Sequence, residues 1–555
     1  MIALLIASFY TCFLIYTFGL FFENRLNFSL NGIERFFLGM ISLTSILGFT
    51  SLFFSLNFQV FAVFVIFSLY AWFLEVGLYF EKTNLSLKNW KFLMGVLFLA
   101  LLSLAVSSYY PYHFDSGLYH VQSSKWINEY GVVPGLGNIH GRFGFNPSIF
   151  LLSALTSWGD WLGQALYTIN FLTFLVMMIY LGRLFFMENE GKKLSLWSLF
   201  LLLSGIIMIR AKGLSTPSPD FIFIALSFFV FIRFLELIRK GHEIKTGTYL
   251  VLIWSIAFIL TVKLSAIPLA ILGIMLWYQF SKQESYNFLK LFLGGIIILL
   301  PWLIRNVIIT GWLVYPFPAL DLFSFDWKIP LEDVIIEKKI ITGFARTFIS
   351  GEELVAADLS FRDWFPLWWN RIGLLQKAVF SLSLIAPVFL MLKYILSSKR
   401  KDFYGPKFNL FGICFTAFAG VLFWLIMAPN WRFGVPFLIF AAASPLWWKE
   451  YYFKLSIPRF SFYLILFFIL GFTNRKELGQ VLDDVVNKDR LYWPQKLPIP
   501  SNFKLASYRV GSVRVYYPKQ GDRCMDFPLP CTNFELDDLV LRGKGIEQGF
   551  KRKSP

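Results

Sequence analysis

Cysteine and histidine are scarce in this chain, which has four of each among its 555 residues. Four cysteines cannot supply a disulfide scaffold for a chain of this length. Cys12 and Cys414 lie in apolar runs, whereas Cys524 and Cys531 stand close together in a polar C-terminal stretch. Only this second pair is placed to form a disulfide, and then only in an oxidising compartment.

The sequence also lacks the common motifs for nucleotide binding and hydrolysis. It has no P-loop, no dinucleotide fingerprint, no serine-hydrolase elbow and no zinc-protease helix. The glycine-containing stretches 135–137 and 141–144 lack the strand-loop-helix context of a nucleotide site, so we interpret them as turns.

Charged residues are few as well, at 15% of the chain, whereas hydrophobic residues make up 57%. A chain of this composition uses lipid as its solvent. Its net charge of +17 could indicate nucleic-acid binding, but the basic residues fall mainly in short segments between apolar runs. The positive-inside rule explains that placement, so membrane lipid is the expected partner and no nucleic acid is expected.

The apolar runs approach the length of about 20 residues that a helix needs to cross a bilayer. The first run has no Lys or Arg ahead of it and no small-residue cleavage site, so we interpret it as a retained helix. The expected fold is an all-α integral membrane protein of about 14 transmembrane helices. The runs lie near residues 2–22, 36–56, 58–80, 91–108, 160–187, 194–209, 219–238, 246–260, 265–280, 287–309, 372–396, 408–427, 432–448 and 460–473.

Lysines and arginines in the short connections predict the orientation, because they resist translocation. They cluster in alternate connections, which are therefore expected on the cytoplasmic side, near residues 82–91, 192–193, 239–245, 399–407 and 449–459. The expected transmembrane domain, 1–473, then has two long outer loops, 109–159 and 310–371. Residues 474–555 form a small extracytoplasmic C-terminal domain of α/β or β type, in which the alternating pattern 507–517 predicts a β-hairpin.

The first long outer loop gathers many chemically active side chains immediately after a transmembrane helix. They include three of the four histidines and are His113, Asp115, Tyr119, His120, Lys125, His140 and Arg142. From Ser116 to Tyr130 the apolar pattern predicts a short helix on the membrane surface that ends at Gly131. Asp115 then stands at the start of this helix.

Two roles are open for Asp115. Either it caps that helix, or its carboxylate acts as a general base toward an acceptor hydroxyl or amine. His113, Asp115 and His120 are also competent metal ligands. Their spacing matches no familiar zinc pattern, however, and hard cations gather more carboxylates. We therefore expect no metal and no cofactor.

Further basic residues lie at the outward ends of apolar runs, where the positive-inside bias disfavours them. They are Arg210, Lys212, Lys263, Arg305 and Arg432. A phosphate or pyrophosphate head group is the partner that such a set predicts. For each residue alone, the alternative is a snorkelling side chain or a salt bridge to a carboxylate such as Asp220 or Asp321.

Four short stretches look like those of a bacterial membrane-protein family with the same layout: 114–120, 129–138, 141–146 and 528–532. With the multi-helix core, the large first outer loop and the small outer C-terminal domain, they resemble the GT-C superfamily of polyprenyl-phosphate-sugar-dependent glycosyltransferases. The resemblance implies that Asp115 is the catalytic base. It also implies that a base such as Arg432, Lys263 or Arg210 holds the donor phosphate.

The chain departs from the better-known members of this superfamily in two respects. About four apolar runs precede the acidic loop, and the loop carries one such acid where many members have a pair.

An outward-facing enzyme has no supply of cytosolic nucleotide sugars, so an activated sugar would arrive on a lipid carrier. We therefore expect a glycosyltransferase that moves a sugar from a polyprenyl-phosphate donor to a glycan, lipid or protein acceptor in cell-surface polysaccharide assembly. The expected location is the bacterial inner membrane, with the outer loops and C-terminal domain in the periplasm. Two alternatives are a transporter or flippase for a lipid-linked glycan, and an assembly protein whose tail binds a partner.

Overall fold

The computed structural model describes most of the chain. The described residues are 1–80, 90–188, 194–211, 213–240, 245–283, 288–349, 351–397, 406–448, 451–453, 458, 460–487, 491–499 and 504–553. Helices dominate these residues, and the strands among them are confined to the C-terminal segment. Most of the short basic connections that predict orientation, and Lys212, lie outside the described residues.

Each of the predicted apolar runs contains a helix, which confirms an integral membrane protein built mainly of helices. Nine described helices are long and apolar enough to cross a membrane. These are α1 (Ile2–Arg25), α2 (Gly32–Thr50), α3 (Phe58–Phe80), α4 (Trp90–Ser107), α8 (Ile169–Glu188), α10 (Pro219–Lys240), α13 (Phe288–Thr310), α17 (Leu374–Ser397) and α18 (Pro406–Met427). The remaining runs form shorter apolar helices: α9 (Leu196–Arg210), α11 (Thr246–Val262), α12 (Leu269–Gln283), α19 (Trp431–Ala442) and α21 (Ser461–Thr473). Fourteen crossings therefore remain a prediction.

Glycine allows the first two helices to touch backbone to backbone. A Cβ atom at Gly39 would lie 1.8 Å from the carbonyl oxygen of Ile15, and one at Gly19 would lie 2.1 Å from that of Arg35. Lipid tails are as apolar as the helices, so no hydrophobic force drives two membrane helices together. Their association depends on close van der Waals packing, which small residues allow. The α1–α2 pair is thus specified by two positions that admit no side chain.

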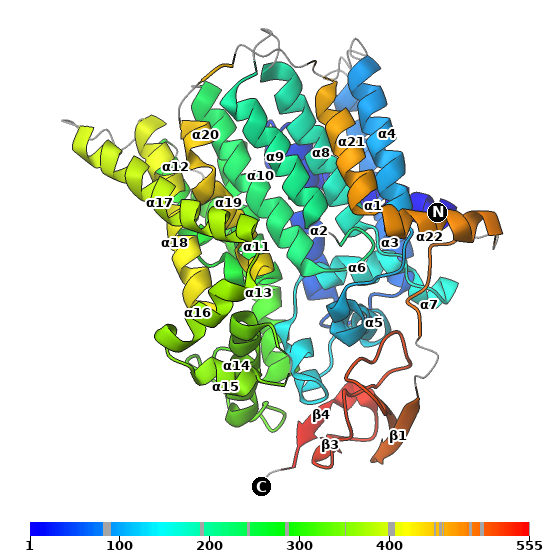
Figure 1. Ribbon diagram of the computed structural model, residues 1–555. Helices are drawn as coiled ribbons and strands as arrows, with labels where there is room; N and C mark the ends of the chain where they lie inside the picture. Colours follow the sequence, from blue (N-terminus) through cyan, green and yellow to red (C-terminus); the bar gives the residue numbers. More distant parts are fainter. Residues whose placement is uncertain are drawn as a thin grey trace.

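Both long loops and the C-terminal segment lie together at one end of the helix bundle (Figure 1). The amphipathic helix α22 (Arg475–Asn487) runs across the bundle axis beside them in the same view. The second long loop forms α14 (Leu331–Thr347), α15 (Glu353–Asp358) and α16 (Phe361–Arg371). The candidate residues of the first long loop therefore lie at this end of the bundle.

The first long loop is a chain of short helical segments. They are the π-helix η1 (Ser116–His120), α5 (Val121–Tyr130), the 3-10 helices η2 (Leu136–Asn138) and η3 (Gly141–Phe145), α6 (Ile149–Ser157) and α7 (Gly159–Leu162). The expected helix and its end at Gly131, which has φ +72°, are present. Its place on the membrane surface stays a prediction, and most residues of α5 are buried by α6 and the C-terminal segment.

The C-terminal segment contains two small antiparallel sheets. Strands β1 (Leu505–Val510) and β2 (Val513–Pro518) form the predicted hairpin around Gly511, and β3 (Leu539–Leu541) pairs with β4 (Phe550–Arg552). Cys524 and Cys531 form a disulfide, as their spacing predicted.

Candidate functional site

The carboxylate of Asp115 is held between two arginines. Asp115 stands at the N-cap position of η1, but its side chain accepts no capping hydrogen bond, so the capping role is wrong. Instead, Nη1 of Arg432 donates to one carboxylate oxygen at 2.5 Å, and Nη1 of Arg142 donates to the other at 3.3 Å. The Asp115 side chain is only 9% exposed. A residue from the first loop thus meets a residue 317 positions later in the chain.

Arg432 connects Asp115 to a second ion pair at the ends of the helices. Its Nη1 lies 3.5 Å from a carboxylate oxygen of Asp220, and the other oxygen of Asp220 accepts from Nζ of Lys263. Asp220 belongs to the first turn of α10, Lys263 follows α11 directly, and Arg432 is in the first turn of α19. The alternative of a salt bridge to Asp220 is therefore found for Lys263, and it forms part of the same network as Asp115.

The ring of Phe433 packs against both cations of this pair. Nζ of Lys263 lies 4.0 Å from the ring centroid, and the guanidinium carbon of Arg432 lies 5.0 Å from it. Cation–π contacts of this kind stabilise a partly desolvated cation without neutralising its charge. The ring thus adds to the ion pairs that both cations make with Asp115 and Asp220.

Two histidines and a tyrosine border Asp115. Nδ1 of His113 lies 3.8 Å from the carboxylate, and Nε2 of the same ring lies 3.5 Å from Nη1 of Arg432. The ring of His120 stacks on that of His113 at 6.0 Å, and Tyr119 meets His120 edge to face at 4.4 Å. Nδ1 of His120 is buried and has no hydrogen-bond partner among the described residues.

Burial and charge act on these groups in opposite directions. Burial alone would raise the pKa of Asp115, but the positive charge of Arg432 and its neighbours outweighs it and holds the pKa below the usual range. Burial lowers the pKa of His120 to about 3, so this imidazole is neutral. Burial also lowers the pKa of His113. The site therefore holds an ionised carboxylate beside neutral histidines.

Sequence reasoning missed Glu337, a residue of the second long loop. Its Oε1 lies 3.7 Å from Nε of Arg142, so Arg142 stands between Glu337 and Asp115. Burial raises the pKa of Glu337, which favours its neutral form. Gly141 allows this approach, because a Cβ atom there would lie 3.0 Å from Glu337 Oε2 and 2.9 Å from the hydroxyl of Tyr315. No sequence pattern singled Glu337 out among the acids of α14.

Several predicted residues do not join this cluster. Lys125 contacts Asp526 and the carbonyl of Phe527 in the C-terminal segment. His140 caps η3 by accepting from the amide of Arg142. Arg210 is exposed at the end of α9 and pairs with no described residue.

Arg305 is also separate from the cluster and is buried. Its guanidinium donates to Ser51 Oγ at 2.7 Å, to Asn146 Oδ1 at 3.2 Å and to the carbonyl of Gly131 at 3.3 Å. These bonds tie the end of α2 to Gly131 and Asn146, the residues that follow α5 and η3. The geometry favours a role in holding that loop.

Cations and carboxyl groups alternate in this cluster. Three cations, Arg142, Arg432 and Lys263, contact the carboxyl groups of Asp115, Asp220 and Glu337. Guanidinium groups bind phosphate through charge-assisted hydrogen bonds, so Arg142 and Arg432 are groups suited to an anion with several acceptor oxygens. Within the described part of the chain, no group of three or more His, Cys, Asp or Glu residues is placed to hold a metal ion.

Comparisons with known proteins add a family but no activity. No curated protein matches the chain. A cryo-EM structure of the arabinosyltransferase EmbB from Mycobacterium smegmatis is similar at 13% identity and a TM-score of 0.35. That match covers 69% of this chain and 33% of the other, and so distant a likeness carries no argument about function. A family model matches residues 1–439, and the chain therefore belongs to the family described as Domain of unknown function (DUF8201).

Proposed function

We propose that this protein is an inverting glycosyltransferase that takes a sugar from a polyprenyl-phosphate donor. One observation carries the proposal: the first-loop residues Asp115 and Arg142 and the distant cations Arg432 and Lys263 form one network at the loop-bearing end of the helices. A base for an acceptor hydroxyl and cations for a lipid-borne phosphate are the two parts that this chemistry needs. The sequence resemblance to GT-C enzymes supports the same reaction class.

The proposed reaction is a single displacement. The acceptor oxygen forms a bond to the anomeric carbon of the donor sugar, and Asp115 takes the proton of that hydroxyl. The bond between the anomeric carbon and the phosphate oxygen breaks, and its electron pair leaves with the polyprenyl phosphate. Arg432 and Lys263 stabilise the negative charge that grows on this oxygen in the transition state. Arg142 and His113 orient the Asp115 carboxylate.

The contact between Asp115 and Arg432 gives the reaction an order. A carboxylate paired with two guanidinium groups is a weak base, because its pKa lies below the usual range. A donor phosphate would compete with Asp115 for Arg432. When Arg432 contacts the phosphate in place of Asp115, the pKa of Asp115 rises and its carboxylate becomes a stronger base. We therefore propose that the donor binds before the acceptor and that it activates the base.

Arg142 contacts Asp115 through Nη1 and Glu337 through Nε, and Tyr315 lies beside Glu337 at Gly141. A carboxyl group and a phenol are suited to hydrogen bonding with sugar hydroxyls. We assign them to the acceptor side, which can be a glycan, a lipid or a protein. The rings of Tyr119 and His113 both pack against His120.

The proposed location is a bacterial inner membrane, with the loop-bearing end and residues 474–555 in the periplasm. The Cys524–Cys531 disulfide supports this orientation, since disulfides persist in oxidising compartments.

A transfer assay tests the proposal. Protein in lipid nanodiscs is incubated with labelled polyprenyl-phosphate monosaccharides and an extract of cell-envelope acceptors, and released polyprenyl phosphate and labelled product are measured. We expect Asp115→Asn to lower the rate by about 10²- to 10⁴-fold, the usual contribution of a general base. Unchanged transfer by this variant would remove Asp115 from the mechanism.

One observation favours the alternative of a transporter. A second buried network joins Glu34 of α2 to Arg233 and Glu236 of α10, and the hydroxyl of Tyr180 donates to Glu236. Asp220 and Arg233 lie on the same helix, about 20 Å apart at about 1.5 Å per residue. Charged groups at both depths are a feature of transport paths. A flux assay separates the functions, because a transporter moves a labelled lipid-linked sugar without changing it.

A further inference from the structure

The disulfide loop of the C-terminal segment lies directly on the π-helix that follows Asp115. The amide of Met525 donates to the carbonyl of Gly117 at 2.8 Å, and Met525 itself is buried. Gly117 lacks the side chain that would meet the Met525 sulfur, since a Cβ atom there would lie 2.5 Å from it. The guanidinium of Arg523 also stacks on the ring of Phe114, at 4.9 Å from its centroid. The loop therefore touches residues on both sides of Asp115.

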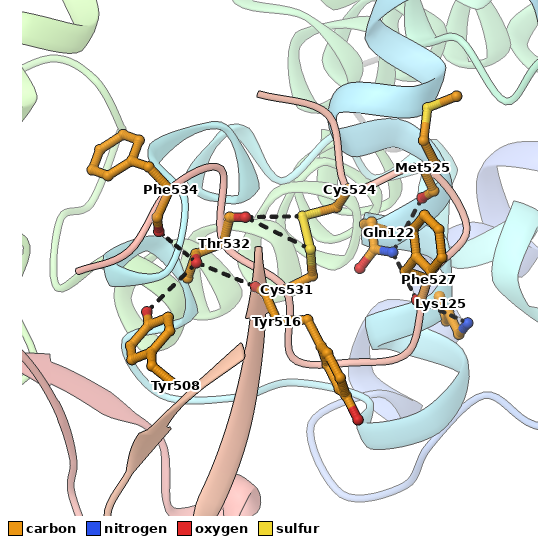
Figure 2. Close-up of a disulfide and its surroundings, with 10 residues drawn as sticks. All are labelled: Gln122, Lys125, Tyr508, Tyr516, Cys524, Met525, Phe527, Cys531, Thr532 and Phe534. Atoms are coloured by element: carbon orange, nitrogen blue, oxygen red, sulfur yellow. Dashed lines mark hydrogen bonds between the residues drawn. A yellow bond between two sulfur atoms is a disulfide. The ribbon is translucent and has the colours of Figure 1, made fainter. Parts of the chain in front are cut away.

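Gln122 fastens the next turn of the same helical stretch to the loop. Its side-chain amide donates to the carbonyls of Met525 at 3.1 Å and Phe527 at 3.0 Å (Figure 2). Gln122 is fully buried, so water cannot replace these bonds without a local opening. Lys125 adds a more exposed bond to the carbonyl of Phe527 at 3.1 Å. Three residues of η1 and α5 are thus bonded to one short loop.

The loop is itself fixed at its other side to the first hairpin. The amide of Thr532 donates to the carbonyl of Tyr516 in β2 at 2.8 Å, and the amide of Tyr516 donates to Pro530 at 3.0 Å. The disulfide between Cys524 and Cys531 closes the intervening residues, as Figure 2 shows. Opening it frees the backbone of Met525, which adopts a left-handed conformation with φ +51°. The disulfide therefore limits the states open to the contact with Gly117.

We infer that the Cys524–Cys531 loop is a positioning element of the Asp115 site, and that reduction of its disulfide releases the Asp115 segment. The inference rests on the proposed function for its consequence in catalysis, but its structural part does not. Gln122 is the positioning residue that transmits the loop's position to η1 and α5. The family match ends at residue 439, so the element that holds the site lies outside the matched part of the chain.

Hydrogen exchange of the full-length protein in nanodiscs tests the structural part. With dithiothreitol, which reduces the disulfide to two thiols and is itself oxidised to a cyclic disulfide, we expect the amides of residues 116–122 to exchange about tenfold faster. The double variant Cys524→Ser, Cys531→Ser should show this faster exchange without dithiothreitol and should not respond to it. The remaining cysteines, Cys12 and Cys414, are free thiols, so dithiothreitol has no other disulfide to open.

Two single variants separate positioning from general loosening of the tail. Gln122→Met keeps the size of the side chain and removes its donors, and it should speed exchange in 116–122 while α10 is unaffected. Tyr517→Phe removes an exposed bond of the same tail, from the Tyr517 hydroxyl to Glu535, in which no residue of η1 or α5 takes part, and should leave 116–122 unchanged. Equal exchange of 116–122 in oxidised and reduced protein would overturn the inference.

Transfer measurements then report on the catalytic part. If the proposed function holds, Gln122→Met should lower kcat about tenfold and change the donor KM less, because the phosphate contacts of Arg432 and Lys263 do not involve the loop. A released segment with unchanged kcat in a protein that transfers sugar would refute the positioning role alone. Absence of transfer in the wild type would refute the proposed function and leave the exchange result standing.

Discussion

The variant Arg432→Gln should bind the donor phosphate more weakly than the wild type does. In the free protein Arg432 already contacts Asp115 at 2.5 Å and Asp220 at 3.5 Å, so phosphate binding exchanges one set of charged contacts for another. A hydrogen bond to a charged group contributes about 1.5 to 3 kcal/mol. The phosphate contact replaces contacts with Asp115 and Asp220, so its net contribution is smaller than that of a new hydrogen bond. We therefore take the lower limit of about 1.5 kcal/mol, which corresponds to about a tenfold weaker Kd.

The assay is equilibrium binding of polyprenyl phosphate to protein in nanodiscs, at two salt concentrations. Arg514→Gln is the matched control, because it removes one exposed arginine of β2 that has no charged partner among the described residues. The control should bind as the wild type does. Arg432→Gln binding as tightly as the control would refute the assignment of Arg432 to the phosphate. Folding must be checked in parallel, since breaking a buried ion pair costs about 3 to 5 kcal/mol and this one retains Arg142 as a second partner.

Three further predictions concern stability and need no substrate. His140→Asn should flatten the acid denaturation profile. Burial lowers the pKa of His140 to about 3, so stability present above the unfolded pKa of about 6.5 is lost as the pH falls toward 3, by about 3 kcal/mol at pH 4.5. A profile as steep as that of the wild type in thermal denaturation would contradict this prediction. Glu337→Gln should raise the thermal denaturation midpoint at pH 8 and not at pH 4. A carboxyl group whose pKa is raised in the folded state destabilises that state increasingly as the pH rises through the pKa. A lower midpoint at pH 8 would show that the carboxylate stabilises the fold. Gly39→Ala should lower the yield of folded protein, because the added Cβ atom would meet the Ile15 carbonyl. The control Gly295→Ala in α13 adds a Cβ atom with nothing within 4 Å and should be tolerated. Equal yields of the two variants on size-exclusion chromatography would refute the close packing of α1 on α2.

The helices were predictable because lipid imposes a strong and local rule on sequence. A run of about 20 apolar residues predicts a membrane-crossing helix at that place in the sequence, whatever the helix packs against. The hairpin at β1 and β2 and the Cys524–Cys531 pair were predictable for the same reason, since alternation and spacing are local patterns. The number of crossings was less accessible, because α19 and α21 are short and composition alone does not say how deep they reach.

The site was predictable only in part, because its contacts are set by packing between distant elements. Chemistry at the loop and at helix ends singled out Asp115, Arg432 and Lys263, and the structure joins them in one network. Arg305 has the same sequence signal, yet it is buried among Ser51, Asn146 and Gly131. Glu337 has no signal of its own, because its importance comes from the burial that α14 gives it beside Arg142.

The most direct test of the central claim is a cryo-EM map of the protein with bound polyprenyl phosphate. We expect the phosphate within hydrogen-bond distance of Arg432 and Lys263, and the Arg432 guanidinium moved away from the Asp115 oxygen that it contacts at 2.5 Å in the free protein. Phosphate density at another surface, with the contact between Asp115 and Arg432 intact, would contradict the claim that these residues form the donor site.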